Sequence, residues 1–305
     1  STREVAYHNG GVCVAPITAD NELIMVRQFR YPYKEVILEL PAGKLHYGEE
    51  PIISGDKGSG TVFFSGCALG CVFCQNERIS HHPLGEIMTP RQLSQVFARL
   101  EEEGVHNINL VTPSHFAPAI FEALSIRKPG IPVVWNSSAY ETPELIEAAR
   151  GLVDIFLPDL KYCSEKSALA LADAPDYFEV ATQAIRAMCR QTGLPKYDEN
   201  GLMLSGTLVR HLVLPLRTRE SMAILDFIAA ELPKGTPVSL MRQYTPMTDT
   251  KLPGLDRRLT DREYRQVRDH MLDLGLDGYL QQKEAANSIY TPAFMDEESR
   301  RLFPG

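Results

Sequence analysis

The sequence predicts an α/β protein built on a mostly parallel sheet. Six short segments rich in Val, Ile, Leu and Phe have the length of buried strands, and segments with helical spacing of apolar residues separate them. The predicted strands span residues 61–66, 107–112, 132–137, 153–160, 207–214 and 237–244. Repeated strand and helix units favour a parallel sheet covered by helices, with functional groups at the carboxyl ends of the strands.

Helix starts are marked between these strands. Thr89 followed by Pro90 is an N-cap and first-turn pair, and the stretch LSQVFARL after it carries apolar residues at helical spacing. Gly104 stands where such a helix should end, and Thr142 with Pro143 repeats the start signal before ELIEAARG. The spacing therefore predicts a helix after each of these two pairs.

Composition limits the possible class of protein. A chain of 305 residues with 44% hydrophobic residues can bury a full core. No apolar run approaches the roughly 18 residues of a membrane span, and the N-terminus lacks the pattern of a signal peptide. We therefore expect a cytoplasmic protein without a membrane partner. The net charge of -8 and the lack of a basic block argue against nucleic acid as a partner.

Half of the six cysteines lie in one short stretch, SGCALGCVFCQN, residues 65–76, with the spacing Cys67-x3-Cys71-x2-Cys74. In a reducing compartment such a cluster indicates a metal site or a redox site. A structural zinc site needs four ligands, and His81 and His82 follow the cysteines without a matching partner pair. Zinc therefore fits poorly.

An iron–sulfur cluster fits three cysteines better. A ferredoxin cluster would need four thiolates, and the remaining cysteines, Cys13, Cys163 and Cys189, are isolated in apolar segments typical of buried residues. Three thiolates on a four-iron cluster leave one iron open to a substrate or cofactor. The fourth ligand is then not expected from the protein.

This spacing, with the aromatic Phe73 before the third cysteine, resembles the signature of the radical S-adenosylmethionine (SAM) superfamily. Further stretches resemble the family of pyruvate formate-lyase activating enzymes: EEPIISGDKGSGTVFFSGCALGCVFCQNERIS, INLVTPSH, LPDLKY, RHLVLP and SLMRQYTP. The resemblance extends from about residue 46 to about residue 285.

The resemblance implies a partial (β/α)6 barrel, here preceded by a short N-terminal β segment. It implies an iron-dependent oxidoreductase whose 4Fe-4S cluster is bound by Cys67, Cys71 and Cys74, with SAM on the open iron. Reductive cleavage of SAM would generate a 5'-deoxyadenosyl radical that abstracts a hydrogen atom. The implied partners are a protein substrate of the glycyl radical enzyme kind and a flavodoxin- or ferredoxin-like electron donor.

Polar residues at the predicted strand ends are candidates for SAM binding. Asp159 and Lys161 lie two residues apart, so a continuing strand directs both to one face. They could instead form a salt-bridged layer, but the similar DLK stretch of the family contributes to SAM binding. Asn136 and Ser138 end another strand, and either could cap the following helix.

The family's Gly-Gly-Glu stretch after the second strand is replaced by TPSH in this chain. Thr112, Ser114 or His115 would then contact the SAM amino group. Alternation places Arg210 and His211 on opposite faces of their strand, and we expect His211 to point inward. The alternative for His211 is a hydrogen-bonded core residue.

The first 45 residues resemble the opening of a Nudix ADP-ribose pyrophosphatase, because GGVCVAPITADNELIMVRQFRYPYKEVILELPAGKL alternates like three strands. Gly43 and Glu49 match the start of the Nudix box, but Lys57 and Gly58 stand where Arg and Glu should be. We predict a truncated Nudix-like segment at 1–45, a radical SAM domain at 46–290 and a tail at 291–305.

Two alternative functions are a nucleotide-diphosphate hydrolase, supported only by residues 1–45, and a non-enzymatic cluster-binding electron carrier or scaffold. A cluster spectrum that does not change when SAM is added would favour the electron carrier or scaffold.

The incomplete Nudix box leads to a negative prediction. Without a carboxylate-rich helix after Gly43, the chain should not release AMP from ADP-ribose in the presence of magnesium. Magnesium-dependent release that survives removal of iron and disappears in Glu49→Gln would contradict this prediction.

Overall fold

The computed structural model describes residues 50–81, 85–246, 252 and 254–281. The chain divides into two units, Ser1–Ile37 and Leu38–Gly305, and every described residue belongs to the second. The Nudix-like segment predicted at 1–45 and the tail predicted at 291–305 both lie outside the described residues. The predicted domain boundaries therefore stay predictions.

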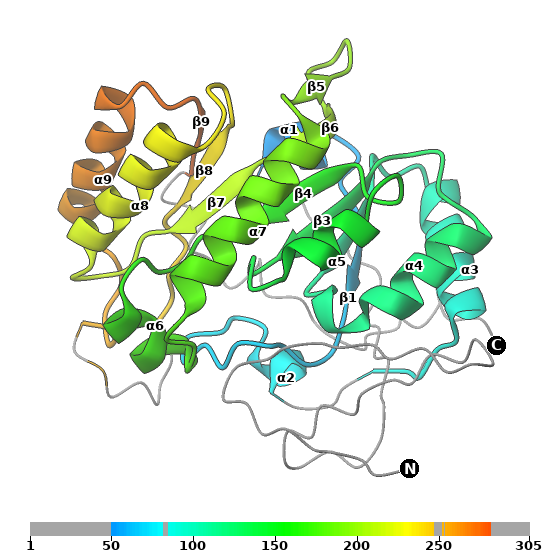
Figure 1. The fold of residues 1–305 in the computed structure, drawn as a ribbon, viewed down its shortest axis with the longest axis horizontal. Helices are drawn as coiled ribbons and strands as arrows, with labels where there is room; N and C mark the ends of the chain where they lie inside the picture. Colours follow the sequence, from blue (N-terminus) through cyan, green and yellow to red (C-terminus); the bar gives the residue numbers. More distant parts are fainter. Residues whose placement is uncertain (1–49, 82–84, 247–251, 253, 282–305) are drawn as a thin grey trace. The chain divides into compact units, whose positions relative to one another are not determined.

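Parallel strands dominate both sheets of the second unit (Figure 1). One sheet has the order β1-β2-β3-β4-β6-β5, with β1 (Gly60–Phe63), β2 (Ile108–Val111), β3 (Val133–Ser137), β4 (Ile155–Pro158), β5 (Lys196–Tyr197) and β6 (Met203–Thr207). The other has the order β7-β8-β9, with β7 (Val209–Leu212), β8 (Val238–Met241) and β9 (Gly278–Leu280). Within these two sheets, only the edge pair β5 and β6 is antiparallel.

Strand β4 joins the two sheets. The single residue Leu208 separates β6 from β7, and its N–H donates to the carbonyl of Phe156 in β4. Beyond this point Asp159 and Arg210 form a parallel bridge, in which the Leu160 N–H donates to the Arg210 carbonyl at 2.8 Å. The succession β1-β2-β3-β4-β7-β8 therefore supplies the six parallel strands of the predicted partial barrel. The strand predicted at 207–214 is interrupted at Leu208, and the strands β5, β6 and β9 were not predicted.

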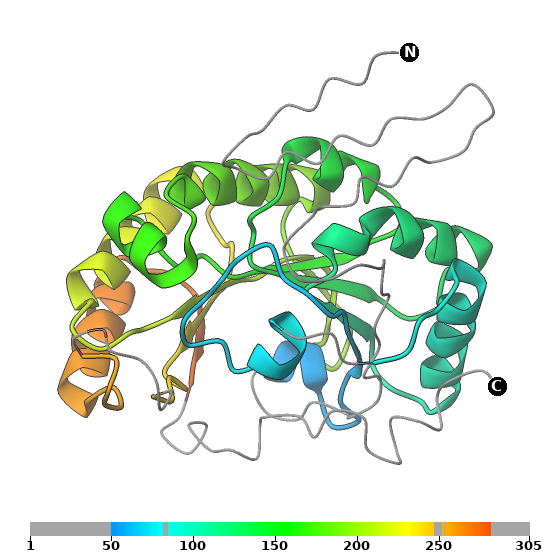
Figure 2. The same cartoon turned by 90° about the horizontal axis from the view of Figure 1, so that it is seen from below.

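Most of the helices cover one face of the curved sheet (Figure 2). The longer ones are α3 (Pro90–Glu102), α4 (Ala117–Ile126), α6 (Glu165–Ala172), α7 (Tyr177–Thr192), α8 (Thr218–Glu231) and α9 (Asp261–Asp273). The shorter ones are α1 (Pro51–Ser54), α2 (Glu77–Ser80), η1 (Ser114–Phe116) and α5 (Pro143–Ala148). None of the helices in the described part of the chain has the length and apolar character needed to cross a bilayer.

The predicted helix starts are confirmed. Thr89 caps α3 in a reciprocal capping box with Gln92, and Thr142 caps α5 through the Leu145 N–H. Pro90 and Pro143 occupy the first turns of these helices, where a missing N–H costs no hydrogen bond. These signals are readable in the sequence because all of the groups involved lie within four residues of one another.

Alternation along the strands separates two apolar clusters. In β3, Val133 and Trp135 belong to the large cluster beneath the helices, while Val134 belongs to a smaller cluster on the other face. The smaller cluster contains Ile52, Ile53, Val134, Ile155, Leu157, Met203 and Leu208. The inner face of the sheet is therefore only partly apolar, because the buried polar residues Thr61 and Asn109 lie level with Val134, and further polar residues lie nearer the carboxyl ends of the strands.

Tyr177 at the start of α7 ties the helix layer to these strand ends. Its ring is buried, and its hydroxyl accepts the Lys161 N–H at 3.0 Å. The same hydroxyl lies 2.6 Å from the Asp159 carbonyl and 2.9 Å from the Ser138 carbonyl, and it donates its proton to this pair of acceptors. One side chain thus holds the backbone after β3 and the backbone after β4.

Tyr177→Phe should reduce the free energy of unfolding by about 1–3 kcal/mol, because three buried backbone groups lose their shared partner. Urea denaturation of the metal-free protein measures the change. Tyr197→Phe is the matched control, since this tyrosine of β5 is 45% exposed. Equal stability of the two variants would show that the Tyr177 hydroxyl contributes nothing.

Candidate functional site

The three clustered cysteines lie in the loop that follows β1. This loop is fixed to the end of α6, because the Gly70 N–H donates to the Ala172 carbonyl at 3.2 Å and the Val72 N–H donates to the Leu171 carbonyl at 3.0 Å. In Figure 2, which views the molecule from below, the loop and α2, both drawn in cyan, lie in front of the strands and within the arc of the outer helices. The cysteines are therefore presented at the carboxyl ends of the strands, as predicted for functional groups.

Each cysteine sulfur accepts one hydrogen bond. Cys71 is buried, whereas Cys67 and Cys74 are partly buried. The donors are the Leu69 N–H to Cys67 Sγ at 3.4 Å, the Tyr162 hydroxyl to Cys71 Sγ at 3.7 Å, and the Ser80 hydroxyl to Cys74 Sγ at 3.2 Å.

Burial and mutual proximity determine the electrostatics of the loop. Burial, together with the neighbouring Cys71, raises the pKa of the Cys67 thiol to about 12. Burial also raises the pKa of Cys71, while the positive charge of Lys161 opposes this rise. Three thiolates gathered here would repel one another unless a cation lay among them.

This donor set fits an iron–sulfur cluster that is bound by three thiolates. Among residues 50–81, 85–246, 252 and 254–281, no three His, Cys, Asp or Glu side chains converge as ligands of a single metal ion. A four-iron cluster differs from a single ion, because each thiolate binds a different iron and the sulfurs need not meet at one point.

The other cysteines lie apart from the loop. Cys189 is buried within α7 as part of the core, as predicted. Cys163 is partly buried against the core, and its thiol donates to the Glu220 carbonyl at 3.6 Å. Cys13 lies outside the described residues.

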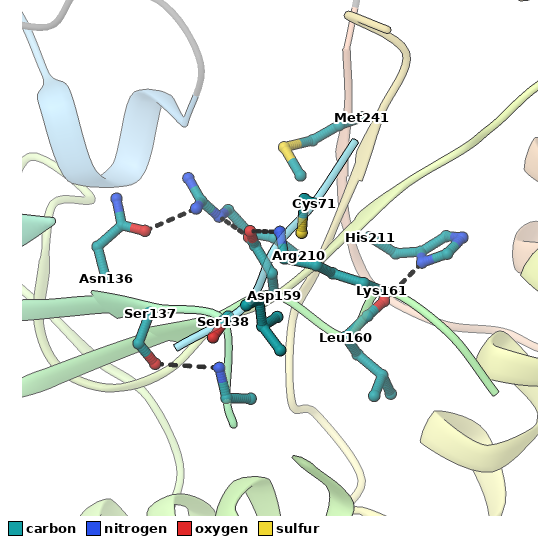
Figure 3. Close-up of polar contacts among 12 residues, drawn as sticks. Cys71, Asn136, Ser137, Ser138, Asp159, Leu160, Lys161, Arg210, His211 and Met241 are labelled. Atoms are coloured by element: carbon teal, nitrogen blue, oxygen red, sulfur yellow. Dashed lines mark hydrogen bonds and ion pairs between the residues drawn. The ribbon is translucent and has the colours of Figure 1, made fainter. Parts of the chain in front are cut away.

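Four polar side chains meet at the inner face of the strand ends (Figure 3). The Asp159 carboxylate accepts from Lys161 Nζ at 2.5 Å and from Arg210 Nε at 2.8 Å. A second nitrogen of the Arg210 guanidinium donates to Asn136 Oδ1 at 2.6 Å. Figure 3 shows Cys71 beside this group, so the strand-end cluster of Asn136, Asp159, Lys161 and Arg210 lies next to the cysteine loop.

The strand-end cluster is ionised although it is mostly buried. Burial alone would raise the pKa of Asp159, but the charges of Arg210 and Lys161 outweigh it and the pKa lies below its usual value. Burial would lower the pKa of Lys161, but Asp159 outweighs it and the net shift is upward. Glu50, 4.0 Å from Arg210, supplies the second negative charge.

His211 lies elsewhere than the sequence suggested. Its Nδ1 is 2.7 Å from the Leu160 carbonyl and its Nε2 is 2.9 Å from the Ser221 hydroxyl in α8. Burial lowers its pKa. These contacts place it in the helix layer as a hydrogen-bonded core histidine, which was the alternative interpretation. The inward position on this strand belongs to Arg210, which the sequence analysis did not choose.

Ser114 is also directed away from the strand-end cluster. Its hydroxyl donates to the buried Glu141 carboxylate, which also accepts from Trp135 Nε1 at 2.7 Å and from the Ser137 hydroxyl at 3.0 Å. Burial raises the pKa of Glu141 despite these three donors. Because Trp135 belongs to the core beneath the helices, this group lies on the helix side of the sheet.

The remaining predicted contacts involve the backbone. Thr112 has a positive φ of 58°, and its N–H donates to the Asn136 carbonyl at 2.9 Å. The Ser138 carbonyl contacts Tyr177, and His115 Nε2 lies 2.6 Å from the Ser65 carbonyl. Of the predicted SAM contacts, the structure brings together Asn136, Asp159 and Lys161.

The fold and the cysteine loop define the class of this protein. The family model of the radical SAM superfamily matches residues 61–228, and the chain belongs to this superfamily. Membership implies a 4Fe-4S cluster and SAM as cofactors.

Among curated proteins, an uncharacterized protein of Methanocaldococcus jannaschii is 30% identical over 234 residues, which cover 73% of this chain and 64% of that protein. The chain thus spans less than two thirds of the length of this relative. The ADP-ribose pyrophosphatase of Bacillus subtilis is 51% identical over only 51 residues, 17% of this chain and 28% of that enzyme. A radical SAM methyltransferase structure from Sphaerobacter thermophilus has 14% identity and a TM-score of 0.52, and it covers 72% of this chain and 65% of its own. This likeness supports the barrel fold.

Single substitutions should distinguish the cysteines that bind the cluster from those that do not. Anaerobically reconstituted parent protein should hold about four irons, while Cys67→Ala, Cys71→Ala and Cys74→Ala should each lose the cluster absorption. Cys163→Ala is the control and should keep it. Equal dependence on Cys163, or stoichiometric zinc after anaerobic purification with iron supplied, would overturn the assignment.

Proposed function

We propose that this chain is a radical SAM enzyme in which Cys67, Cys71 and Cys74 hold the cluster and the strand-end cluster binds SAM. The observation that carries the proposal is the position of Lys161, whose charge acts on both Cys67 and Cys71 while its ammonium pairs with Asp159. A reduced 4Fe-4S cluster held by these three cysteines would supply the one electron needed for the reductive cleavage of SAM, and the strand-end cluster would hold SAM in place for it.

Several residues of the strand-end cluster contribute to SAM binding in different ways. The Lys161 ammonium has three donor hydrogens, of which Asp159 uses one, so it can also pair with the SAM carboxylate. The Asn136 oxygen accepts from Arg210, and its amide nitrogen has no hydrogen-bond partner among the residues that the structure describes, so it can donate to SAM. Arg210 acts as a positioning residue, because it holds both Asp159 and Asn136 in place.

The other residues predicted to contact SAM receive different roles. We assign Ser114 and His211 to the support of the strand ends, because the hydroxyl of Ser114 and both ring nitrogens of His211 already have partners. Thr112 and Ser138 follow β2 and β3 closely, and we propose that they contact SAM through their backbone or hydroxyl groups.

We propose, on the resemblance in sequence, that the substrate is a protein of the glycyl radical enzyme kind and that a flavodoxin- or ferredoxin-like protein donates the electron. A radical on a glycine Cα, detected by electron paramagnetic resonance (EPR) after incubation with such a substrate protein, SAM and reductant, is the expected result. Formation of 5'-deoxyadenosine without any glycine radical across a panel of such proteins would point to another substrate.

The central test concerns Lys161. Dithionite-reduced parent protein should convert SAM to 5'-deoxyadenosine and methionine, and Lys161→Ala should bind SAM about 10-fold or more weakly while keeping four irons. Loss of a charge-assisted hydrogen bond causes the change. Lys161→Ala is preferable to Asp159→Asn, because Asp159 keeps Arg210 as a partner, whereas Asp159→Asn would leave two buried cations.

Lys128→Ala is the matched control for this test. Lys128 pairs with Asp154 at 2.8 Å, immediately before β4, so it is an ion-paired lysine at the opposite end of the same strand. It should bind and cleave SAM like the parent. If the double variant Asp159→Asn, Lys161→Ala also did so, the pair would be a structural salt bridge, and SAM binding would have to be assigned to Asn136 and Ser138 instead.

A further inference from the structure

Tyr162 places a hydroxyl against the most buried sulfur of the cysteine loop. The side chain is 1% exposed, and its ring is held edge-on by Phe73 and Tyr177, with ring centroids 6.5 Å and 5.3 Å away. Within the described residues, Cys71 Sγ is the one hydrogen-bond partner of this hydroxyl, at 3.7 Å. The Tyr162 hydroxyl is thus a buried hydrogen-bond donor whose acceptor is a sulfur atom.

This arrangement suits a thiolate better than a thiol. A neutral thiol is a weak acceptor, so a buried tyrosine hydroxyl that depends on one is poorly satisfied. A hydrogen bond to a charged acceptor is roughly twice as strong as one to a neutral acceptor. Cys71 bound to iron is a thiolate, and Tyr162 would then have a full partner.

Ser80 repeats the arrangement at another sulfur. It ends α2, and its backbone N–H is already bonded to the Asn76 carbonyl. Its hydroxyl donates to Cys74 Sγ at 3.2 Å. Two of the three sulfurs therefore receive side-chain donors from outside the Cys67–Cys74 segment, whereas Cys67 receives the Leu69 N–H from within it.

We propose that the Tyr162 and Ser80 hydroxyls raise the reduction potential of the cluster by donating hydrogen bonds to its Cys71 and Cys74 thiolates. Reduction adds negative charge to the cluster and its sulfurs, so donors to the sulfurs stabilise the reduced form more than the oxidised form. Both residues are positioning residues that act through the ligands. The inference rests on the proposed function, because it takes Cys71 and Cys74 as cluster ligands.

The test uses variants that remove only the hydroxyl. Tyr162→Phe keeps the ring that packs between Phe73 and Tyr177, and Ser80→Ala keeps the Cβ. Each full-length variant is reconstituted anaerobically, its iron is counted, and its midpoint potential is measured by redox titration with EPR detection of the reduced cluster. Both potentials should shift to more negative values than that of the parent, and the double variant should shift further.

Two hydroxyl deletions away from the sulfurs serve as controls. Tyr140→Phe removes a hydroxyl from the same group of stacked tyrosines, where it is bonded to Asp176 at 2.7 Å. Ser125→Ala removes a hydroxyl that donates to the Phe121 carbonyl within α4. The potentials of both controls should equal that of the parent.

The possible outcomes separate this inference from the proposed function. Unchanged or more positive potentials in Tyr162→Phe and Ser80→Ala, at full iron content, would overturn the inference and leave the proposed function standing. Failure of the parent to bind iron would instead overturn the proposed function. If Tyr162→Phe alone loses iron, the potential of Ser80→Ala decides whether the inference holds, because this variant tests the same effect at a different ligand.

Discussion

One pair of opposite charges joins the two sheets at the point where the site is built. The Asp159 carboxylate and the Arg210 guanidinium are linked by an ion pair of 2.8 Å, and their backbones form the bridge between β4 and β7. Both side chains are mostly buried, so loss of Asp159 would leave Arg210 and Lys161 without their shared carboxylate, at a cost of about 3–5 kcal/mol. The ion pair and the backbone bridge therefore lie at the same point, where the barrel continues from β4 to β7. Its formation also fixes the remaining oxygen of Asp159, which holds Lys161.

The apolar surroundings of this charge pair give it its importance. Ile53, Ile155 and Leu157 belong to an apolar cluster on the inner face, and the aromatic and aliphatic core lies beneath the helices on the other face. Charges enclosed by such surroundings interact more strongly than they would in water. The same enclosure raises the pKa values of Cys67 and Cys71, so the loop is suited to thiolates only when a cationic group lies among them.

The tyrosines after β4 connect this polar region with the helix layer. Tyr177 binds the backbone after β3 and after β4, and its ring packs edge-on against that of Tyr162, whose hydroxyl donates to Cys71 Sγ. A change in the packing of α7 would therefore be transmitted to the Cys71 sulfur through two rigid rings. The stability of the fold and the electronic properties of the site depend on some of the same side chains. Removing a single hydroxyl group keeps the packing of the ring or Cβ, so its effect on the site can be measured apart from an effect on folding.

The sequence by itself determined what depends on neighbouring residues. The Thr89-Pro90 and Thr142-Pro143 helix starts, the repeated strand and helix units and the cysteine spacing are local patterns, and the structure has the helices and the parallel strands that they predict. Only the tertiary structure decided which of Arg210 and His211 points inward, because alternation gives opposite faces without saying which face lies inside. It also placed Ser114 on Glu141 and Tyr162 on Cys71, contacts across 27 and 91 residues that depend on how the strands align. Local spacing carries no information about such alignments, because they are set by the packing of whole strands and helices against one another.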